Sequence, residues 1–205
     1  MEGRRAPTLA THPRRSAFTP GGKAFVKTLP GALAPFGFFD PLQLTPESVE
    51  DVLLWREAEI THGRVAMVAA LGFVVGENFH PMFPSIGGPA INMLGQCDAQ
   101  VAAGLLTPIF LSEMYRATKG WVEPNFSDAE VQRSTIRKLR DNYLPGSLGL
   151  DLTGNKPKDS KWLTATTGPW ADWQNKELNN GRLAMLAIAG MVGQELATGT
   201  TLFGN

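Results

Sequence analysis

Three helix-forming segments of the chain each contain twelve consecutive residues without Asp, Glu, Lys or Arg. These uncharged runs cover residues 65–76, 101–112 and 183–194. Each run is rich in Ala, Leu, Val or Met and is flanked by polar residues, which favours a helix rather than a strand at this length. The pattern predicts three long helices, over about residues 46–79, 97–118 and 170–198.

The first of these helices has sequence signals at both ends. Thr45 is a typical N-cap, Pro46 suits the first turn, and Glu47 places negative charge at the positive end of the helix dipole. His80 followed by Pro81 ends the helix, and we expect a loop over residues 82–95. A helix of this length spans about 50 Å, enough to cross a membrane at a tilt and to protrude from it.

The first and third segments are two copies of one motif. Residues 55–77 (WREAEITHGRVAMVAALGFVVGE) and residues 173–195 (WQNKELNNGRLAMLAIAGMVGQE) are identical at ten of 23 positions. A Leu-Pro-Gly-x-Leu sequence precedes both copies, at residues 29–33 and 144–148. An internal repeat of this kind predicts two helices related by a local two-fold axis.

Each copy places a Glu and an Arg five residues apart, beside the uncharged run. Positions i and i+5 of a helix point about 140° apart, so the two side chains cannot readily pair on their own helix. Because an unpaired charge beside an apolar run is costly, we expect the helices to cross and to pair Glu59 with Arg182 and Glu177 with Arg64. Four small residues would let the backbones approach at that crossing: Gly63, Ala66, Gly181 and Ala184.

Three residues after each Glu, on the same helix face, lie His62 in the first copy and Asn180 in the second. Glu, His and Asn side chains can each give one lone pair to a metal that needs a single axial ligand. The magnesium of a chlorophyll is such a metal, because the ring nitrogens already supply four ligands. The candidate ligands of the repeat are therefore Glu59, His62, Glu177 and Asn180.

The two motifs, Glu-x-x-His-x-Arg-x-Ala-Met at residues 59–67 and Glu-x-x-Asn-x-Arg-x-Ala-Met at residues 177–185, resemble those of the light-harvesting chlorophyll-binding antenna proteins of thylakoid membranes. The resemblance covers most of the chain beyond about residue 30. It implies an all-α membrane protein with three transmembrane helices, the first and third crossed and linked by Glu–Arg pairs. The expected domain comprises residues 45–205, behind a stromal extension and loop, residues 1–44.

Within that family, two features look like the fucoxanthin chlorophyll a/c-binding proteins of red-lineage algae more than the plant chlorophyll a/b type. They are the segment GENFHPMF, residues 76–83, and the short C-terminus. The resemblance implies chlorophyll a, chlorophyll c and fucoxanthin-type carotenoids as cofactors, with bound lipid as a further candidate. Chlorophyll magnesium is the metal expected.

The resemblance adds three candidate ligands outside the repeat motifs. Glu113 matches the ligand of the family's middle helix, and Arg116 would neutralise it, although the spacing alone also fits a surface ion pair. Gln194 matches a further ligand position, and an amide inside an apolar run needs a partner. His80 is either a ligand on the lumenal side or a residue that caps the helix end.

Three departures from the family pattern affect the expected pigments. Leu105 stands where plant members carry Gln, so that site is expected to be lost or served by water. The plant family's C-terminal His has no counterpart. A loop with Phe39-Asp40-Pro41-Leu42 precedes the first helix, as it does in the family near a carotenoid end group, but the second copy, residues 149–153, lacks this sequence.

The distribution of charge supports a membrane topology, although the mean hydropathy is only −0.10 and no stretch reaches the ~18 apolar residues of a typical span. Of 19 Lys and Arg residues, six lie in residues 1–27, ten between Arg116 and Lys176, and none in residues 65–115 or 183–205. Three crossings with the N-terminus on the basic side produce this pattern. Without the repeat, a soluble helical protein would be favoured.

The resemblance and the charge pattern together imply a thylakoid protein of the chloroplast with a stromal N-terminus. Residues 1–29 are basic like a transit peptide, and we expect them to remain as a surface extension. Residues 127–140 open with a capping box and should lie along the stromal surface. The expected partners are a photosystem core, I or II, neighbouring antenna subunits and thylakoid lipids. The balanced charge, 19 basic against 19 acidic residues, argues against nucleic acid.

Two functions other than an antenna that passes excitation to a photosystem fit parts of the sequence. The Glu59–His62 spacing is half of a di-iron carboxylate site. The second copy carries Asn180, a poor iron ligand, and the neighbouring Arg side chains would repel iron, so we expect no enzyme activity. A photoprotective family member that dissipates excitation would use the same scaffold, and the sequence hardly separates the two. Cys97 is the single cysteine, which excludes an internal disulfide.

Overall fold

The structure is a computed structural model of the 205-residue chain and describes residues 21–33, 35–79, 86–123, 136–141, 143–149 and 168–203. This part of the chain consists of helices and the loops that connect them, with two isolated β-bridges, Leu33–Gly37 and Trp121–Leu139. Its helices are α1 (Gly22–Val26), α2 (Val49–Asn78), α3 (Ala90–Gln96), α4 (Ala99–Gly120) and α6 (Pro169–Thr198). His80 and residues 127–135, both discussed above, lie outside the described residues.

Helix α2 begins three residues later than the sequence signals indicated. Ser48 is the N-cap, and its side chain accepts a hydrogen bond of 3.2 Å from the backbone N–H of Glu50. Thr45 does not cap the helix, because its hydroxyl donates to Asp40 Oδ2 at 2.5 Å. The expected cap at Thr45 is therefore wrong, and that residue closes the preceding loop instead.

Two helix boundaries near the middle of the chain also differ from expectation. Part of the expected loop over residues 82–95 is the short helix α3, which a Pro at position 89 precedes. Helix α4 begins and ends two residues later than the expected 97–118, and runs from Ala99 to Gly120. Pro108 lies inside α4 without ending it.

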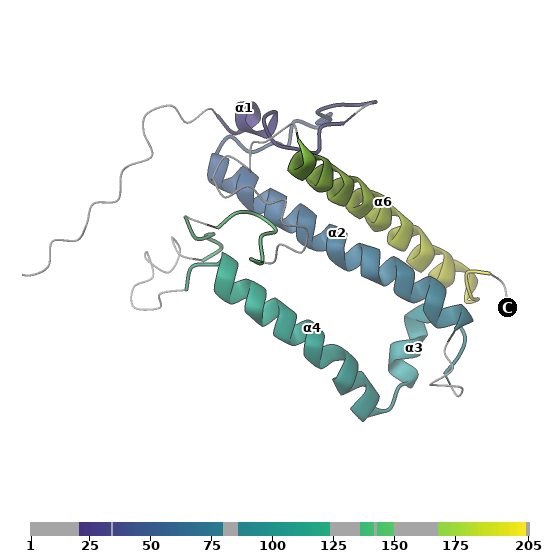
Figure 1. The fold of residues 1–205 in the computed structure, drawn as a ribbon. Helices are drawn as coiled ribbons and strands as arrows, with labels where there is room; N and C mark the ends of the chain where they lie inside the picture. Colours follow the sequence, from purple (N-terminus) through teal and green to yellow (C-terminus); the bar gives the residue numbers. More distant parts are fainter. Residues whose placement is uncertain are drawn as a thin grey trace, which may run out of the picture.

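Helices α2 and α6 lie against each other along much of their length, whereas the backbone of α4 approaches either of them at very few points (Figure 1). The two helices meet at Gly63 and Gly181, where a Cβ built on either glycine would lie 3.0 Å from the Cα of the other. The buried apolar residues of α2 and α6 are few and mostly small: Val52, Ala66, Ala171, Leu178 and Ala184. Glycine is required at the crossing because it lets the backbones meet.

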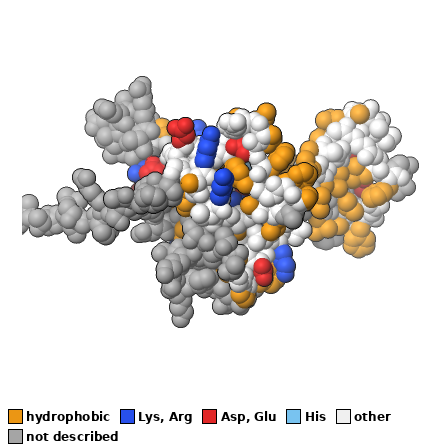
Figure 2. All heavy atoms as spheres, turned by 90° about the horizontal axis from the view of Figure 1, so that it is seen from above, with side chains coloured by type: hydrophobic (Ala, Val, Ile, Leu, Met, Phe, Trp, Pro, Cys, Tyr) orange, Lys and Arg blue, Asp and Glu red, His pale blue; other side chains and the backbone are white. Residues whose placement is uncertain are grey.

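Large apolar side chains cover the outside of the long helices rather than their interior. Val68 of α2 and Leu186 of α6 are 74% and 75% exposed, and Phe110 of α4 is 63% exposed. Figure 2 shows a broad hydrophobic area toward the right of the view and most charged side chains toward the left. Of the described helices, α2 is the one that is long enough and apolar enough in composition to cross a membrane. Exposed apolar surface of this extent requires apolar partners.

Candidate functional site

The helix crossing brings the two Glu–Arg pairs of the repeat together. Arg64 Nε donates to Glu177 Oε1 at 2.7 Å, and Arg182 Nε donates to Glu59 Oε1 at 2.8 Å. Each arginine therefore reaches across to the other helix, in the arrangement that the five-residue spacing indicated. The pairs are only partly shielded, since the four side chains are between 28% and 41% exposed.

The two pairs differ in their other contacts. Glu59 Oε2 also lies 3.0 Å from Nη1 of Arg56, a residue whose side chain is largely buried. Arg182 Nη1 donates to the carbonyl oxygen of Gly31 at 2.6 Å, which ties the segment before α2 to α6. The two ion pairs are thus related by the local two-fold axis, but the residues that contact them are not all related in the same way.

The glycines of the two Leu-Pro-Gly sequences make equivalent contacts with the two repeat helices. Gly31 N–H donates to Asn175 Oδ1, and Gly146 N–H donates to Glu57 Oε2, both at 2.7 Å. Asn175 and Glu57 are 118 residues apart, the offset of the repeat. Both glycines have a positive φ, 107° and 77°, which only glycine adopts without strain.

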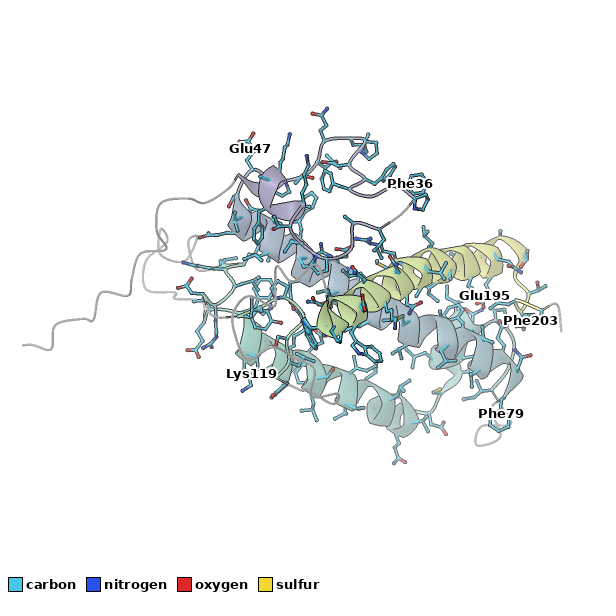
Figure 3. The ribbon with its side chains drawn as sticks, turned by 45° about the horizontal axis from the view of Figure 1, so that its top comes forward. Phe36, Glu47, Phe79, Lys119, Glu195 and Phe203 are labelled. Carbon is cyan, nitrogen blue, oxygen red and sulfur yellow. The ribbon has the colours of Figure 1, made fainter. Side chains whose placement is uncertain are left out.

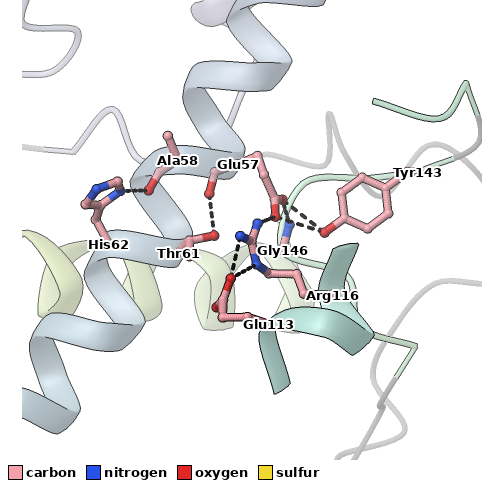
Figure 4. Close-up of polar contacts among 8 residues, drawn as sticks. All are labelled: Glu57, Ala58, Thr61, His62, Glu113, Arg116, Tyr143 and Gly146. Carbon is pink, nitrogen blue, oxygen red and sulfur yellow. Dashed lines mark hydrogen bonds and ion pairs between the residues drawn. The ribbon is translucent and has the colours of Figure 1, made fainter. Parts of the chain in front are cut away.

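Glu57 is the functional residue that the sequence reasoning missed. It is 2% exposed, and its carboxylate accepts hydrogen bonds from three residues of two different segments (Figure 4). Arg116 Nη1 of α4 donates at 3.0 Å, the Tyr143 hydroxyl lies 3.1 and 3.0 Å from the two oxygens, and Gly146 N–H donates at 2.7 Å. The signal available in the sequence was its place opposite Asn175 in the repeat, but the two residues are not identical.

Tyr143 lies in the segment after α4 and serves as a donor. Burial raises the pKa of the Tyr143 phenol, and the negative charge of Glu57 raises it further. The hydroxyl therefore keeps its proton and donates a hydrogen bond to the carboxylate of Glu57.

Glu113 lies one helical turn before Arg116 and shares its guanidinium. Arg116 Nε and Nη2 donate to Glu113 Oε2 at 3.0 and 2.6 Å. The Glu113 side chain is 47% exposed at the surface of α4. Arginine thus binds one carboxylate oxygen, Oε2, and the other, Oε1, can serve as a metal ligand.

The other candidate ligands within the described residues lie singly on exposed helix surfaces. His62 Nδ1 lies 2.7 Å from the carbonyl oxygen of Ala58, so a proton on Nδ1 leaves the Nε2 lone pair free for a metal (Figure 4). Gln194 Nε2 donates to the carbonyl oxygen of Leu202 at 3.1 Å, which leaves its Oε1 as an acceptor. Asn180 is exposed on α6.

These ligands do not converge on one metal. Among the described residues, no three His, Cys, Asp or Glu side chains are close enough to hold a metal ion together. The donor set instead offers one neutral or arginine-paired ligand per site, each beside exposed apolar side chains. That chemistry fits a magnesium that carries a large apolar ring and needs one axial ligand.

An apolar hollow of about 800 Å³ lies between the loop before α2 and the crossed helices. Asp40 holds this loop by accepting hydrogen bonds from Leu44 N–H at 2.9 Å and from Thr45. The Thr45 hydrogen bond lowers the pKa of Asp40, which favours the charged, accepting form. The hollow is lined mainly by large apolar residues: Phe36, Phe38, Phe39, Leu42, Trp55 and Leu186.

The opposite end of the bundle, where Glu195 and Phe203 lie in Figure 3, carries the last identical pair of the repeat. Glu77 Oε2 accepts from Leu202 N–H at 2.9 Å and Oε1 from Ala90 N–H at 3.3 Å. Glu195 is 2% exposed and accepts from Ile91 N–H at 2.9 Å. These two carboxylates tie α3 and the C-terminal segment to α2 and α6.

The crossed helices and the candidate donors fit one class of protein, a helical scaffold for magnesium-centred pigments. The chain belongs to the chlorophyll a/b-binding protein family, because the family model described as Chlorophyll A-B binding protein matches residues 25–196. The resemblance inferred from the paired motifs is thereby confirmed.

Particular relatives fall into two groups. Light-harvesting complex stress-related protein 3.2 of Chlamydomonas reinhardtii is 44% identical over 213 residues, covering 99% of this chain and 76% of that protein. Stress-related protein 1 of the same alga is 46% identical over 188 residues, covering 88% and 69%. A fucoxanthin-chlorophyll a-c binding protein of Isochrysis galbana is 40% identical over 178 residues, covering 86% and 80%. The motifs indicated the fucoxanthin group; they did not single out the stress-related proteins.

Proposed function

We propose that this chain is a light-harvesting protein of the chloroplast thylakoid membrane, in which α2, α4 and α6 cross the bilayer with the N-terminus on the stromal side. It binds chlorophylls and carotenoids and passes excitation energy to a photosystem core, I or II, and to neighbouring antenna subunits. The observation that carries the proposal is the set of single magnesium ligands on exposed apolar helix faces. The protein performs no bond chemistry, in keeping with its pigment-binding relatives.

Each ligand is held in a state that suits magnesium. Glu59, Glu177 and Glu113 are carboxylates whose charge is balanced by an arginine on the neighbouring helix or the next turn. His62 and Gln194 use their other polar atom on a backbone carbonyl, which orients the free lone pair. Asn180 and, outside the described residues, His80 complete the proposed set. Chlorophyll a and chlorophyll c supply the photophysics, while these side chains set pigment spacing and orientation.

The apolar hollow beside α2 and α6 is the proposed binding site for the end group of a carotenoid, and a fucoxanthin-type carotenoid is the first candidate. Its lining of Phe, Leu and Trp provides apolar contact, and Arg182 and Glu59 lie at its inner wall as polar partners. Carotenoid and chlorophyll rings would cover the exposed apolar side chains described above, together with thylakoid lipids. Pigment contact therefore accounts for the small protein core.

Energy dissipation is the second candidate function, because two of the relatives that match most of this chain are named stress-related. Harvesting and dissipation use the same scaffold and differ in the fate of the excited state. The decisive measurement for this pair is the chlorophyll fluorescence lifetime of the purified, pigment-loaded protein.

Pigment analysis tests the proposal itself. The full chain, purified with its pigments, should contain chlorophyll a, chlorophyll c and a fucoxanthin-type carotenoid after extraction and separation. Chlorophyll b in place of chlorophyll c would keep the scaffold and replace the accessory pigment. A colourless protein that contains iron would overturn the proposal in favour of a membrane di-iron enzyme.

A further inference from the structure

Glu57 is not one of the proposed magnesium ligands, yet its carboxylate is buried and fully engaged in polar contacts. It lies on α2, yet its donors come from α4 and from the segment of residues 143–149. Because the backbone of α4 approaches α2 and α6 at very few points, packing alone does not fix α4. The Arg116–Glu57 contact of 3.0 Å is a direct polar link from α4 to the crossed pair.

The geometry of Arg116 couples this link to the candidate ligand Glu113. A guanidinium group is a rigid planar fork, so fixing one of its nitrogens fixes the direction of the others. Glu57 holds Nη1, and Glu113 Oε2 receives Nε and Nη2 at 3.0 and 2.6 Å. The contact with Glu57 thereby sets the direction from which the guanidinium meets Glu113, and with it the orientation of that carboxylate.

Charge supports the same coupling. Arg116 faces two carboxylates, and Glu57 also receives the Tyr143 hydroxyl and the Gly146 N–H, which stabilise its negative charge without neutralising it. A neutral residue at position 57 would leave the whole positive charge of Arg116 to Glu113. A carboxylate drawn more strongly toward arginine is a weaker donor to magnesium.

We propose that Glu57 is a positioning residue for the chlorophyll bound at Glu113: through Arg116 it orients that carboxylate and sets its strength as a magnesium ligand. The inference rests on the proposed pigment-binding function. Glu57 itself is 2% exposed, and its three donors surround it, so it acts through Arg116 rather than by touching a pigment.

The test uses the full chain refolded with a chlorophyll and carotenoid mixture, in four variants beside the unaltered protein. Glu113→Ala should lose one chlorophyll per chain, and its difference spectrum at low temperature defines the absorption band of that pigment. Glu57→Gln keeps the side-chain volume and removes the charge. It should shift that same band and lower the occupancy of that chlorophyll by at least half, while the other pigments remain.

Two further variants separate positioning from stability. Tyr143→Phe removes one donor to Glu57 and retains Arg116, so the same band should shift by a smaller amount at full pigment stoichiometry. Asp51→Asn, an exposed neutralisation on the same helix, should leave the spectrum unchanged.

The outcomes distinguish this inference from the proposed function. If Glu113→Ala retains every chlorophyll, the proposed ligand is wrong. If it loses one and Glu57→Gln leaves that band unshifted and fully occupied, Glu57 has no positioning role. A proportional loss of all pigments in Glu57→Gln would also overturn the inference. If Glu57→Gln does not refold, an unshifted band in Tyr143→Phe overturns it.

Discussion

Replacing Gly63 by alanine tests the close crossing of α2 and α6. The new Cβ would lie 3.0 Å from the Cα and 3.5 Å from the carbonyl carbon of Gly181. Both atoms belong to backbone, so no flexible side chain can move aside. The helices must separate by several tenths of an ångström, which also lengthens the flanking ion pairs, now 2.7 and 2.8 Å.

Gly72 provides the matched control. It lies on the same helix, and a Cβ built there meets nothing within 4 Å. Gly→Ala in a helix contributes up to about 1 kcal/mol of stability through helix propensity at either position. Overpacking costs about 1–3 kcal/mol, so Gly63→Ala should be less stable than Gly72→Ala by that amount.

The assay is thermal denaturation of the pigment-loaded protein, followed by visible circular dichroism at one fixed scan rate. For a chain of this size about 1 kcal/mol corresponds to roughly 2–4 °C. The Tm of Gly63→Ala should therefore fall below that of Gly72→Ala by about 2–12 °C. Equal Tm values for the two variants would refute the close backbone contact and, with it, the reasoning that small residues set the crossing.

Three other predictions follow from contacts described above. Arg182→Ala should destabilise the refolded protein by about 1–3 kcal/mol, because Glu59 keeps only Arg56 as a cation partner; unchanged Tm and refolding yield would contradict this. His62→Leu should lose one chlorophyll per chain and keep the fold, measured by pigment extraction, and unchanged stoichiometry would remove His62 from the ligand set. The raised pKa of Tyr143 makes folding favour the neutral phenol, so stability should be full below about pH 10, where an unfolded tyrosine ionises, and fall as the pH rises further. Tyr143→Phe should reduce that fall in Tm, and parallel pH profiles would show that Tyr143 makes no contribution.

The repeat made the helix crossing and its ion pairs accessible to sequence reasoning. A Glu and an Arg five residues apart cannot satisfy each other on one helix, and a second copy supplies the partners. The family's motif then supplied Glu113 and Gln194, whose surroundings the sequence alone left open between a ligand and an ordinary surface residue.

Contacts of residues outside the shared motif of the repeat were not accessible in this way. Glu57 carries no motif of its own, and Arg116 has a nearer carboxylate three residues away, so nothing in the spacing pointed to a link with α2. Thr45 was misassigned as a cap because its competing partner, Asp40, belongs to a loop whose path the sequence does not reveal. The short helix α3 has too few residues to show a helical period.

Glu57 and Asn175 occupy equivalent places in the two copies of the repeat but make different contacts. If the two copies matched at this position, both flanks of the crossed pair would offer the same polar group to a third helix. Only one flank offers a carboxylate to Arg116; the other carries a neutral amide that holds Gly31. The Glu at this one position therefore makes the two flanks chemically different, and α4 is linked to the flank that carries the carboxylate.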